Sequence, residues 1–213
     1  MRKFLIILIS VALATGAAVA QKRFTFGPKI GVDYTHYWGK NAGHGGQLNY
    51  QAGMFFEYRF NSKFSIAPEV VFAAQGGKND GVVFTGETLH SDYFDAVYTD
   101  NLNYINVPVM LKYYVCPSLS IDFGPQLGVN VYHKCTVKGK DGHKDYKKTY
   151  DTDAQSVDFG IGLGLTYNIT KDVFVQGRYT MGLTDAYKKF LGATYPIINS
   201  KNGNAQIAIG FRF

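Results

Sequence analysis

Apolar and polar side chains alternate at every second position through most of this chain, and this periodicity constrains the fold more than any other feature. Residues 157–169 read VDFGIGLGLTYNI, with apolar side chains at the odd positions and Asp, Gly, Thr or Asn between them. Residues 104–115 and 205–213 alternate in the same way. A repeat of two places successive side chains on opposite faces of a strand, whereas a helix needs a repeat near 3.6. The sequence therefore predicts an all-β protein.

Eight segments alternate in this way, and each has 11 residues or more. A tilted strand that crosses a bilayer needs about 9–11 residues, and outer-membrane barrels have short turns on one side and longer loops on the other. We predict an eight-stranded antiparallel transmembrane up-and-down β-barrel over residues 21–213, with both termini on the periplasmic side. The predicted strands are 24–37, 48–60, 64–76, 103–115, 119–133, 156–168, 173–184 and 203–213, joined by short turns at 61–63, 116–118 and 170–172 and long loops at 39–47, 77–102, 134–155 and 185–202.

The two faces of these strands differ in charge. The face that carries Ile30, Phe56 and Phe123 has no charged side chain. A Lys or Arg facing lipid at mid-membrane costs roughly 2–4 kcal/mol, so this face suits contact with outer-membrane lipid. The opposite face carries five positive and five negative side chains, which balance as a narrow lumen requires. We expect a lumen charge network made of Lys29, Asp33, Glu57, Arg59, Glu69, Lys112, Asp122, Asp158, Arg178 and Arg212.

Two soluble folds compete with the membrane barrel. A β-sandwich or a lipocalin-like barrel also alternates, because it buries the apolar face and wets the charged one. Long strands, alternating loop lengths and aromatic residues near strand ends favour the membrane barrel. Four prolines inside the predicted strands argue against the membrane barrel, because a proline in a strand removes a ladder hydrogen bond. We interpret Pro28, Pro68, Pro108 and Pro125 as bulge positions.

The short turns predict specific contacts in the lumen. The turn at 116–118 places Lys112 opposite Asp122, close enough for an ion pair. It also places Cys116 and Cys135 at opposite ends of one strand, too far apart for a disulfide.

The turn at 170–172 predicts that Gly162 faces Arg178. Because Gly160 and Gly164 lie beside Gly162, this wall leaves room for the arginine, whose guanidinium needs carboxylates from other strands. The candidates are Glu57, Glu69 and Asp158.

Residues 1–20 have the features of a secretory signal peptide. Arg2 and Lys3 precede an apolar run from Phe4 to about Leu13, and Ala18-Val19-Ala20 forms an A-x-A cleavage site. A membrane anchor is the alternative, but this run is shorter than the roughly 20 residues of a spanning helix. We therefore expect an exported protein whose mature chain begins at Gln21.

Several short motifs recur along the predicted strands: YINVPVMLKY at 104–113, Gly124-Pro125, Asp158-Phe159-Gly160 with Gly162 and Gly164, Arg178-Tyr179 with Gly182-Leu183, and Gly210-Phe211-Arg212-Phe213. Together they resemble the PorT-like family of small outer-membrane β-barrel proteins in Bacteroidota. The resemblance covers essentially the whole mature chain and implies a barrel, but no assigned activity. It also implies that the closing aromatic residue, Phe213, is the terminal signal read by the outer-membrane assembly machinery.

The sequence favours no enzymatic or metal-dependent activity. Histidines occur at 36, 44, 90, 133 and 143, but no G-x-S-x-G, H-E-x-x-H or CxxC motif accompanies them. We therefore expect no catalytic residue, cofactor or metal. A charged fraction of only 18% without a basic stripe also argues against a nucleic-acid partner.

The expected function is structural or interaction-based. Eight strands enclose an interior that side chains can fill, so the barrel is expected to anchor extracellular loops that contact a protein partner. The alternatives are a narrow channel or transport barrel, and an accessory protein for secretion or assembly.

Overall fold

The computed structural model of the protein describes residues 23–39, 45–85, 92–141, 144–151, 153–189 and 200–213. These residues form twelve strands, and among them no helix is long and apolar enough to cross a membrane. The predicted signal peptide, residues 1–20, lies outside the described residues, as do His44, His90 and His143. The strands are β1 (Phe24–Trp38), β2 (Gln47–Arg59), β3 (Phe64–Gln75), β4 (Lys78–Thr85), β5 (Asp92–Cys116), β6 (Leu119–Asp141), β7 (Lys144–Asp151), β8 (Asp153–Ala154), β9 (Val157–Asn168), β10 (Val173–Asp185), β11 (Tyr187–Lys189) and β12 (Lys201–Phe211).

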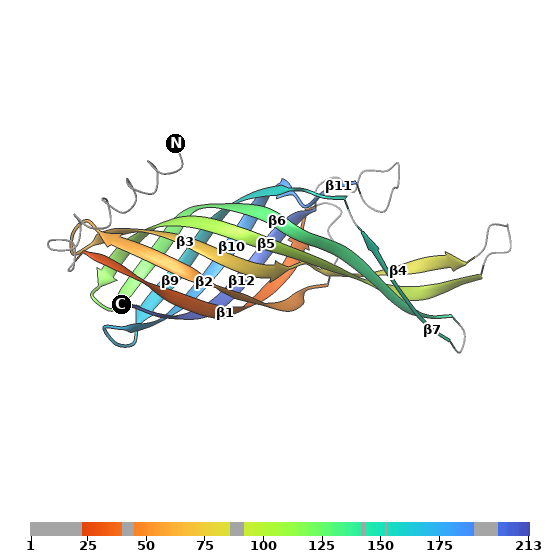
Figure 1. The fold of residues 1–213 in the computed structure, drawn as a ribbon, viewed down its shortest axis with the longest axis horizontal. Coiled ribbons are helices and arrows are strands. Elements are labelled where there is room, and N and C mark those ends of the chain that lie inside the picture. The colour runs from red at the N-terminus through yellow and green to blue at the C-terminus, as the bar shows by residue number, and fades with distance from the viewer. Residues whose placement is uncertain (1–22, 40–44, 86–91, 142–143, 152, 190–199) are drawn as a thin grey trace, which may run out of the picture.

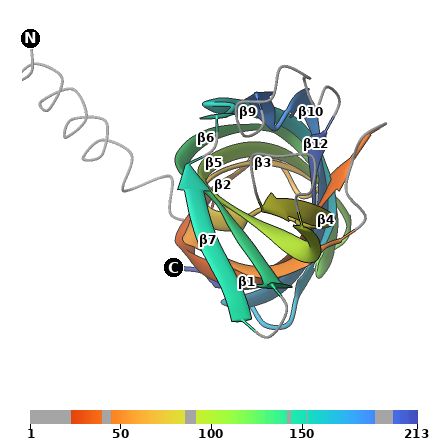
Figure 2. The same cartoon turned by 90° about the vertical axis from the view of Figure 1, so that its right-hand side faces the viewer.

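Eight of these strands close into a barrel, as the alternation predicts. The antiparallel order is β5-β3-β2-β1-β12-β10-β9-β6, and a further pairing of β6 with β5 closes the ring. The view along the barrel in Figure 2 shows this closed ring. The eight barrel strands are those predicted from sequence, but β5 and β6 are much longer than expected. The three short turns join β2 to β3, β5 to β6 and β9 to β10. They therefore lie at the end of the barrel where β1 begins and β12 ends.

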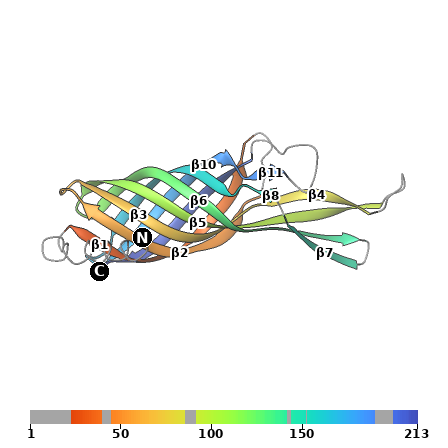
Figure 3. The same ribbon diagram turned by 45° about the horizontal axis from the view of Figure 1, so that its top comes forward.

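The sequence predicted loops at 77–102 and 134–155, but the described residues of these two connections lie mostly in strands. Residues 92–101 of β5 and 134–141 of β6 pair beyond the ring, with β4 on one side and β7 on the other. We call these four segments the sheet extension; they project from the end of the barrel opposite the short turns (Figures 1 and 3). Pairing satisfies backbone groups that an irregular loop would leave to water. β8 and β11 form a separate small sheet nearby.

The four prolines do not lie at bulges, so that interpretation is wrong. The β2–β3 register is unchanged across Pro68, because Phe55 pairs with Glu69 and Tyr58 with Ile66 on either side of it. In β5–β6 the register shifts only at 103–104 and 114–116, away from Pro108 and Pro125. Each strand residue directs its N–H to one neighbour only. A proline therefore costs one ladder bond without needing an inserted residue.

The barrel is apolar outside and polar inside. Ile30 and Leu163 on the outer face are 60% and 59% exposed, whereas Lys29 and Asp122 on the inner face are 1% and 0% exposed. A soluble sandwich or lipocalin-like barrel would bury the apolar set. The observed arrangement is therefore the reverse of both soluble alternatives.

The two cysteines are free. Cys116 is exposed at the end of β5, whereas Cys135 is buried and pairs with Asp100, near the other end of that long strand. The predicted separation is therefore present. Burial, with the Asp100 carboxylate as a second cause, raises the pKa of the Cys135 thiol well above its usual range.

Candidate functional site

A buried carboxylate with two cations spans the middle of the lumen. Glu69 on β3 accepts two hydrogen bonds from the Arg178 guanidinium on β10, at 3.0 and 2.6 Å. Lys29 on β1 donates to the same carboxylate at 2.7 Å and to Gln176 at 2.9 Å. All of these side chains are at most 4% exposed. The cluster ties together three strands from different parts of the ring.

A second set of contacts continues from Gln176 toward the short turns. The Gln176 amide donates to Asp122 at 3.1 Å, and the Thr166 hydroxyl donates to the same carboxylate at 2.5 Å. Lys112 lies 3.6 Å from Asp122 and directly opposite it across β5 and β6. The ion pair predicted from the turn at 116–118 is therefore present, with Thr166 and Gln176 as additional partners.

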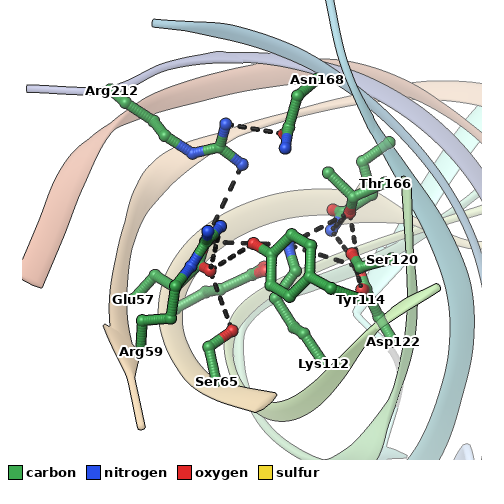
Figure 4. A network of polar contacts seen from close by, with 12 residues as sticks. Glu57, Arg59, Ser65, Lys112, Tyr114, Ser120, Asp122, Thr166, Asn168 and Arg212 are labelled. Atoms are coloured by element: carbon green, nitrogen blue, oxygen red, sulfur yellow. Dashed lines mark hydrogen bonds and ion pairs between the residues drawn. The ribbon is translucent and has the colours of Figure 1, made fainter. Parts of the chain in front are cut away.

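Glu57 forms the third set, at the turn end of the lumen (Figure 4). Its carboxylate accepts a hydrogen bond from Ser65 at 2.8 Å and another from Tyr114. Three cations surround it without hydrogen bonding: Lys112 at 3.9 Å, and Arg59 and Arg212 at 3.8 Å each. We call these three linked sets the lumen network.

The predicted surroundings of Arg178 are partly wrong. Arg178 pairs with Gly164, and Gly162 pairs with Thr180. The turn lies where it was predicted, centred on Lys171, but the register that it sets differs by two residues from the predicted pairing of Gly162 with Arg178. The glycine wall still makes room, since a Cβ on Gly164 would lie 3.1 Å from the Arg178 Cβ.

Of the three candidate carboxylates for Arg178, the structure assigns one. Glu69 binds the arginine, whereas Glu57 lies in the turn-end set and Asp158 accepts hydrogen bonds from Thr184 at 2.5 Å and Asn202 at 3.1 Å. Asp33 is fully buried, and neither of its carboxylate oxygens hydrogen-bonds to a member of the lumen network among the described residues. Arg59 lies at the mouth with its side chain 39% exposed.

Sequence reasoning selected charged residues and so missed the neutral members of the lumen network. Gln176, Thr166, Ser65 and Tyr114 carry many of its hydrogen bonds. The sequence pattern does mark these four residues, because each lies on the same face of its strand as a charged residue of the lumen. Applying the periodicity to every polar side chain would have found them.

Phe213 packs at the outer edge of the turn end. Its backbone N–H donates to the Phe26 carbonyl at 2.8 Å, and its ring lies 5.8 Å from the Phe26 ring. The ring is 66% exposed. Phe213 therefore extends the chain as an exposed aromatic residue two positions beyond the end of β12. The role of Phe213 in assembly stays a prediction.

The lumen network joins strands from different parts of the barrel wall. Its groups hydrogen-bond to one another at distances typical of direct contact. These contacts therefore cross-link the barrel from the inside. Within the described part of the chain, no group of three or more His, Cys, Asp or Glu side chains is arranged to hold a metal ion.

An apolar exterior around a polar interior, closed by eight antiparallel strands, defines an outer-membrane β-barrel protein. The chain belongs to the family described as outer membrane protein beta-barrel domain, whose model matches residues 19–188. The protein is therefore placed in the outer membrane, in contact with its lipid.

Several solved structures resemble this chain at low identity. Ail, the attachment invasion locus protein of Yersinia pestis, is 13% identical with a TM-score of 0.47, over 90% of this chain and 99% of that one. Neisserial surface protein A is 10% identical with a TM-score of 0.47, over 88% and 97% of the two chains. OprG from Pseudomonas aeruginosa is 12% identical with a TM-score of 0.34, over 89% and 95%. No curated protein matches the chain.

Proposed function

We propose that this protein is a closed outer-membrane anchor that presents the sheet extension to a protein partner outside the cell. The observation that carries the proposal is the continuity of β5 and β6, which run unbroken from the barrel into the sheet extension. Such a connection holds the projecting sheet at a fixed position relative to the membrane.

The edges of the sheet extension suggest how a partner binds. β4 and β7 end the strand order, and among the described residues their outer edges pair with no other strand, although Lys78 at the start of β4 forms a bridge with Gly45. An unpaired edge offers a row of backbone donors and acceptors to an added strand. We expect the partner to contribute an extended segment along β4 or β7.

The lumen network argues against the channel alternative. Ion pairs that join β1, β3 and β10 across the interior obstruct the path of a hydrated ion. A secretion or assembly role fits the PorT-like resemblance, and we include PorT-like membership, a Bacteroidota source and a cleaved signal peptide at 1–20 in the proposal. We propose no enzymatic activity, because no catalytic motif occurs in the sequence.

Conductance across a planar bilayer tests the closed-anchor proposal. The purified wild-type barrel is expected to conduct negligibly, and Arg178→Ala to open a small leak, because the variant removes one cross-lumen contact. Steady conductance of the wild type at the level of a general porin would contradict the proposal and favour the channel.

Display is tested separately on intact cells. An epitope inserted between positions 142 and 143, which join β6 to β7, should bind antibody without permeabilisation. The same epitope in the turn at 61–63 should require permeabilisation. The reverse pattern would mean that the sheet extension faces the periplasm, and display to an external partner would be wrong.

A further inference from the structure

The lumen opens into a pocket of about 470 Å³ at the end that carries the short turns. The start of β1 with the preceding Arg23, the end of β2, and Arg212 directly after β12 contribute residues, and the turn between β5 and β6 and the segment from the end of β9 into the next turn contribute the rest. We call it the turn-end pocket. Its charged and amide side chains are those of Arg23, Glu57, Arg59, Asn168, Lys171 and Arg212.

The turn-end pocket has an excess of positive charge. Four cations line it, of which Lys171 is paired with Asp172 at 3.9 Å, and Glu57 is the one carboxylate among the lining residues. That carboxylate already accepts from Ser65 and Tyr114 and has Lys112 within 3.9 Å. It therefore cannot neutralise the arginines as well. Elsewhere in the lumen, cations and carboxylates make direct hydrogen bonds.

Arg212 is held in place but has an unused donor. Its Nη1 donates to the Asn168 side chain at 2.7 Å, and its guanidinium lies 4.5 Å from the centre of the Phe174 ring. Its Nη2 is buried, lies 3.8 Å from Glu57 and has no hydrogen-bond partner. The side chain is only 8% exposed. A buried guanidinium N–H without an acceptor is costly, so the site favours an incoming anion.

Arg59 is placed similarly on the other side of Glu57. Its guanidinium lies 4.1 Å from the centre of the Tyr114 ring and 3.8 Å from the Glu57 carboxylate. Figure 4 shows both arginines converging on Glu57 from different strands. Stacking on aromatic rings restricts both guanidinium groups, so little side-chain freedom is lost when an anion binds.

We propose that the turn-end pocket binds a phosphate group presented from the periplasm, independently of what the sheet extension binds. A phosphate offers several acceptor oxygens in different directions and up to two negative charges, which matches two guanidinium forks and further cations better than one carboxylate or chloride does. The pocket is larger than a phosphate alone, so the group can be carried by a soluble phosphomonoester or by a phospholipid headgroup.

Calorimetric titration of the full-length protein in a maltoside detergent tests the proposal, because phosphocholine detergents would themselves supply phosphate. The probes are inorganic phosphate and glycerol 3-phosphate, with sodium chloride at equal ionic strength as the blank. We expect one saturable site per chain. Replacing Arg59 and Arg212 together by Gln should weaken binding roughly tenfold or more, because charge-assisted hydrogen bonds are lost.

Matched variants separate the site from general charge. Lys138→Gln removes one cation from the exposed face of the sheet extension and should leave binding unchanged. Arg212→Lys keeps the positive charge but loses the two-pronged guanidinium, and should also weaken phosphate binding. This single variant tests the site independently of how well the double variant folds.

The source of the phosphate is resolved by comparing soluble probes with nanodiscs. Saturable binding of glycerol 3-phosphate indicates a soluble ligand. Arg59- and Arg212-dependent binding to phosphatidylglycerol nanodiscs alone indicates a lipid headgroup. No heat above the chloride blank with any probe, or equal binding by wild type and the double variant, would overturn the proposal.

Discussion

At the scale of single residues, Glu69 has a different role from its two partners. Arg178 and Lys29 both donate to it, so the carboxylate compensates two buried cations at once. Loss of either cation leaves Glu69 paired with the other. Loss of Glu69 leaves two positive charges facing each other in the middle of the lumen, where desolvation makes an uncompensated charge expensive.

Glu69→Ala is therefore expected to destabilise the barrel more than Arg178→Ala or Lys29→Ala. Breaking a buried pair by removing one partner typically costs about 3–5 kcal/mol. Denaturant unfolding in lipid vesicles measures the difference. Asp172→Ala is the control, because its ion pair with Lys171 at 3.9 Å is exposed and should contribute at most about 1 kcal/mol. Equal losses for the three lumen variants would mean that Glu69 is not the shared acceptor.

At the scale of elements, the sequence predicts the barrel strands well and the sheet extension poorly. Alternation identifies β9 and β10 nearly to their last residues, because one side of each strand faces lipid and the other a polar lumen. That contrast ends where β5 and β6 leave the barrel, so residues 92–101 and 134–141 carry a weaker pattern. The short turn at 116–118 predicts the pair of Lys112 and Asp122, whereas the partner of Arg178 depends on strands across the lumen, which no local pattern encodes.

Gly76 joins β3 to β4, which pair in succession with the same strand, β5. Its φ of 136° is one that other residues rarely adopt, and a Cβ there would lie 1.9 Å from the Asp100 carbonyl oxygen. Gly76→Ala should therefore loosen β4 and raise amide hydrogen exchange over residues 78–85 but not over β12. Gly177→Ala is the matched control, because a Cβ there meets no atom within 4 Å. Unchanged exchange in β4 would show that the strained turn does not hold the sheet extension.

At the scale of the whole molecule, the barrel reverses the usual arrangement of a soluble protein. Charged and amide side chains are buried, while large apolar residues cover the outside. Lipid makes this arrangement favourable, because it leaves the exposed apolar face in hydrocarbon and requires every backbone group to be paired within the closed ring.

The depth of the lipid contact predicts the effect of an added charge. Leu163→Arg lies near the middle of β9 on the outer face and should cost about 2–4 kcal/mol. Leu48→Arg lies near the loop end of β2, is also outward, and should cost about 0–1 kcal/mol. Unfolding from lipid vesicles compares the two variants, and a larger loss for Leu48→Arg would contradict the assigned position of the membrane.

The unbroken passage of β5 and β6 from barrel to sheet extension has a mechanical consequence. Between the tip and the barrel the two strands have no loop to stretch, so a force applied to the tip passes along them, through the register shift at 103–104. Within the barrel those strands are bonded side by side to each other and to β3 and β9. Pulling outward would therefore shear many hydrogen bonds at once instead of opening them one after another, so the barrel itself is expected to resist such a force.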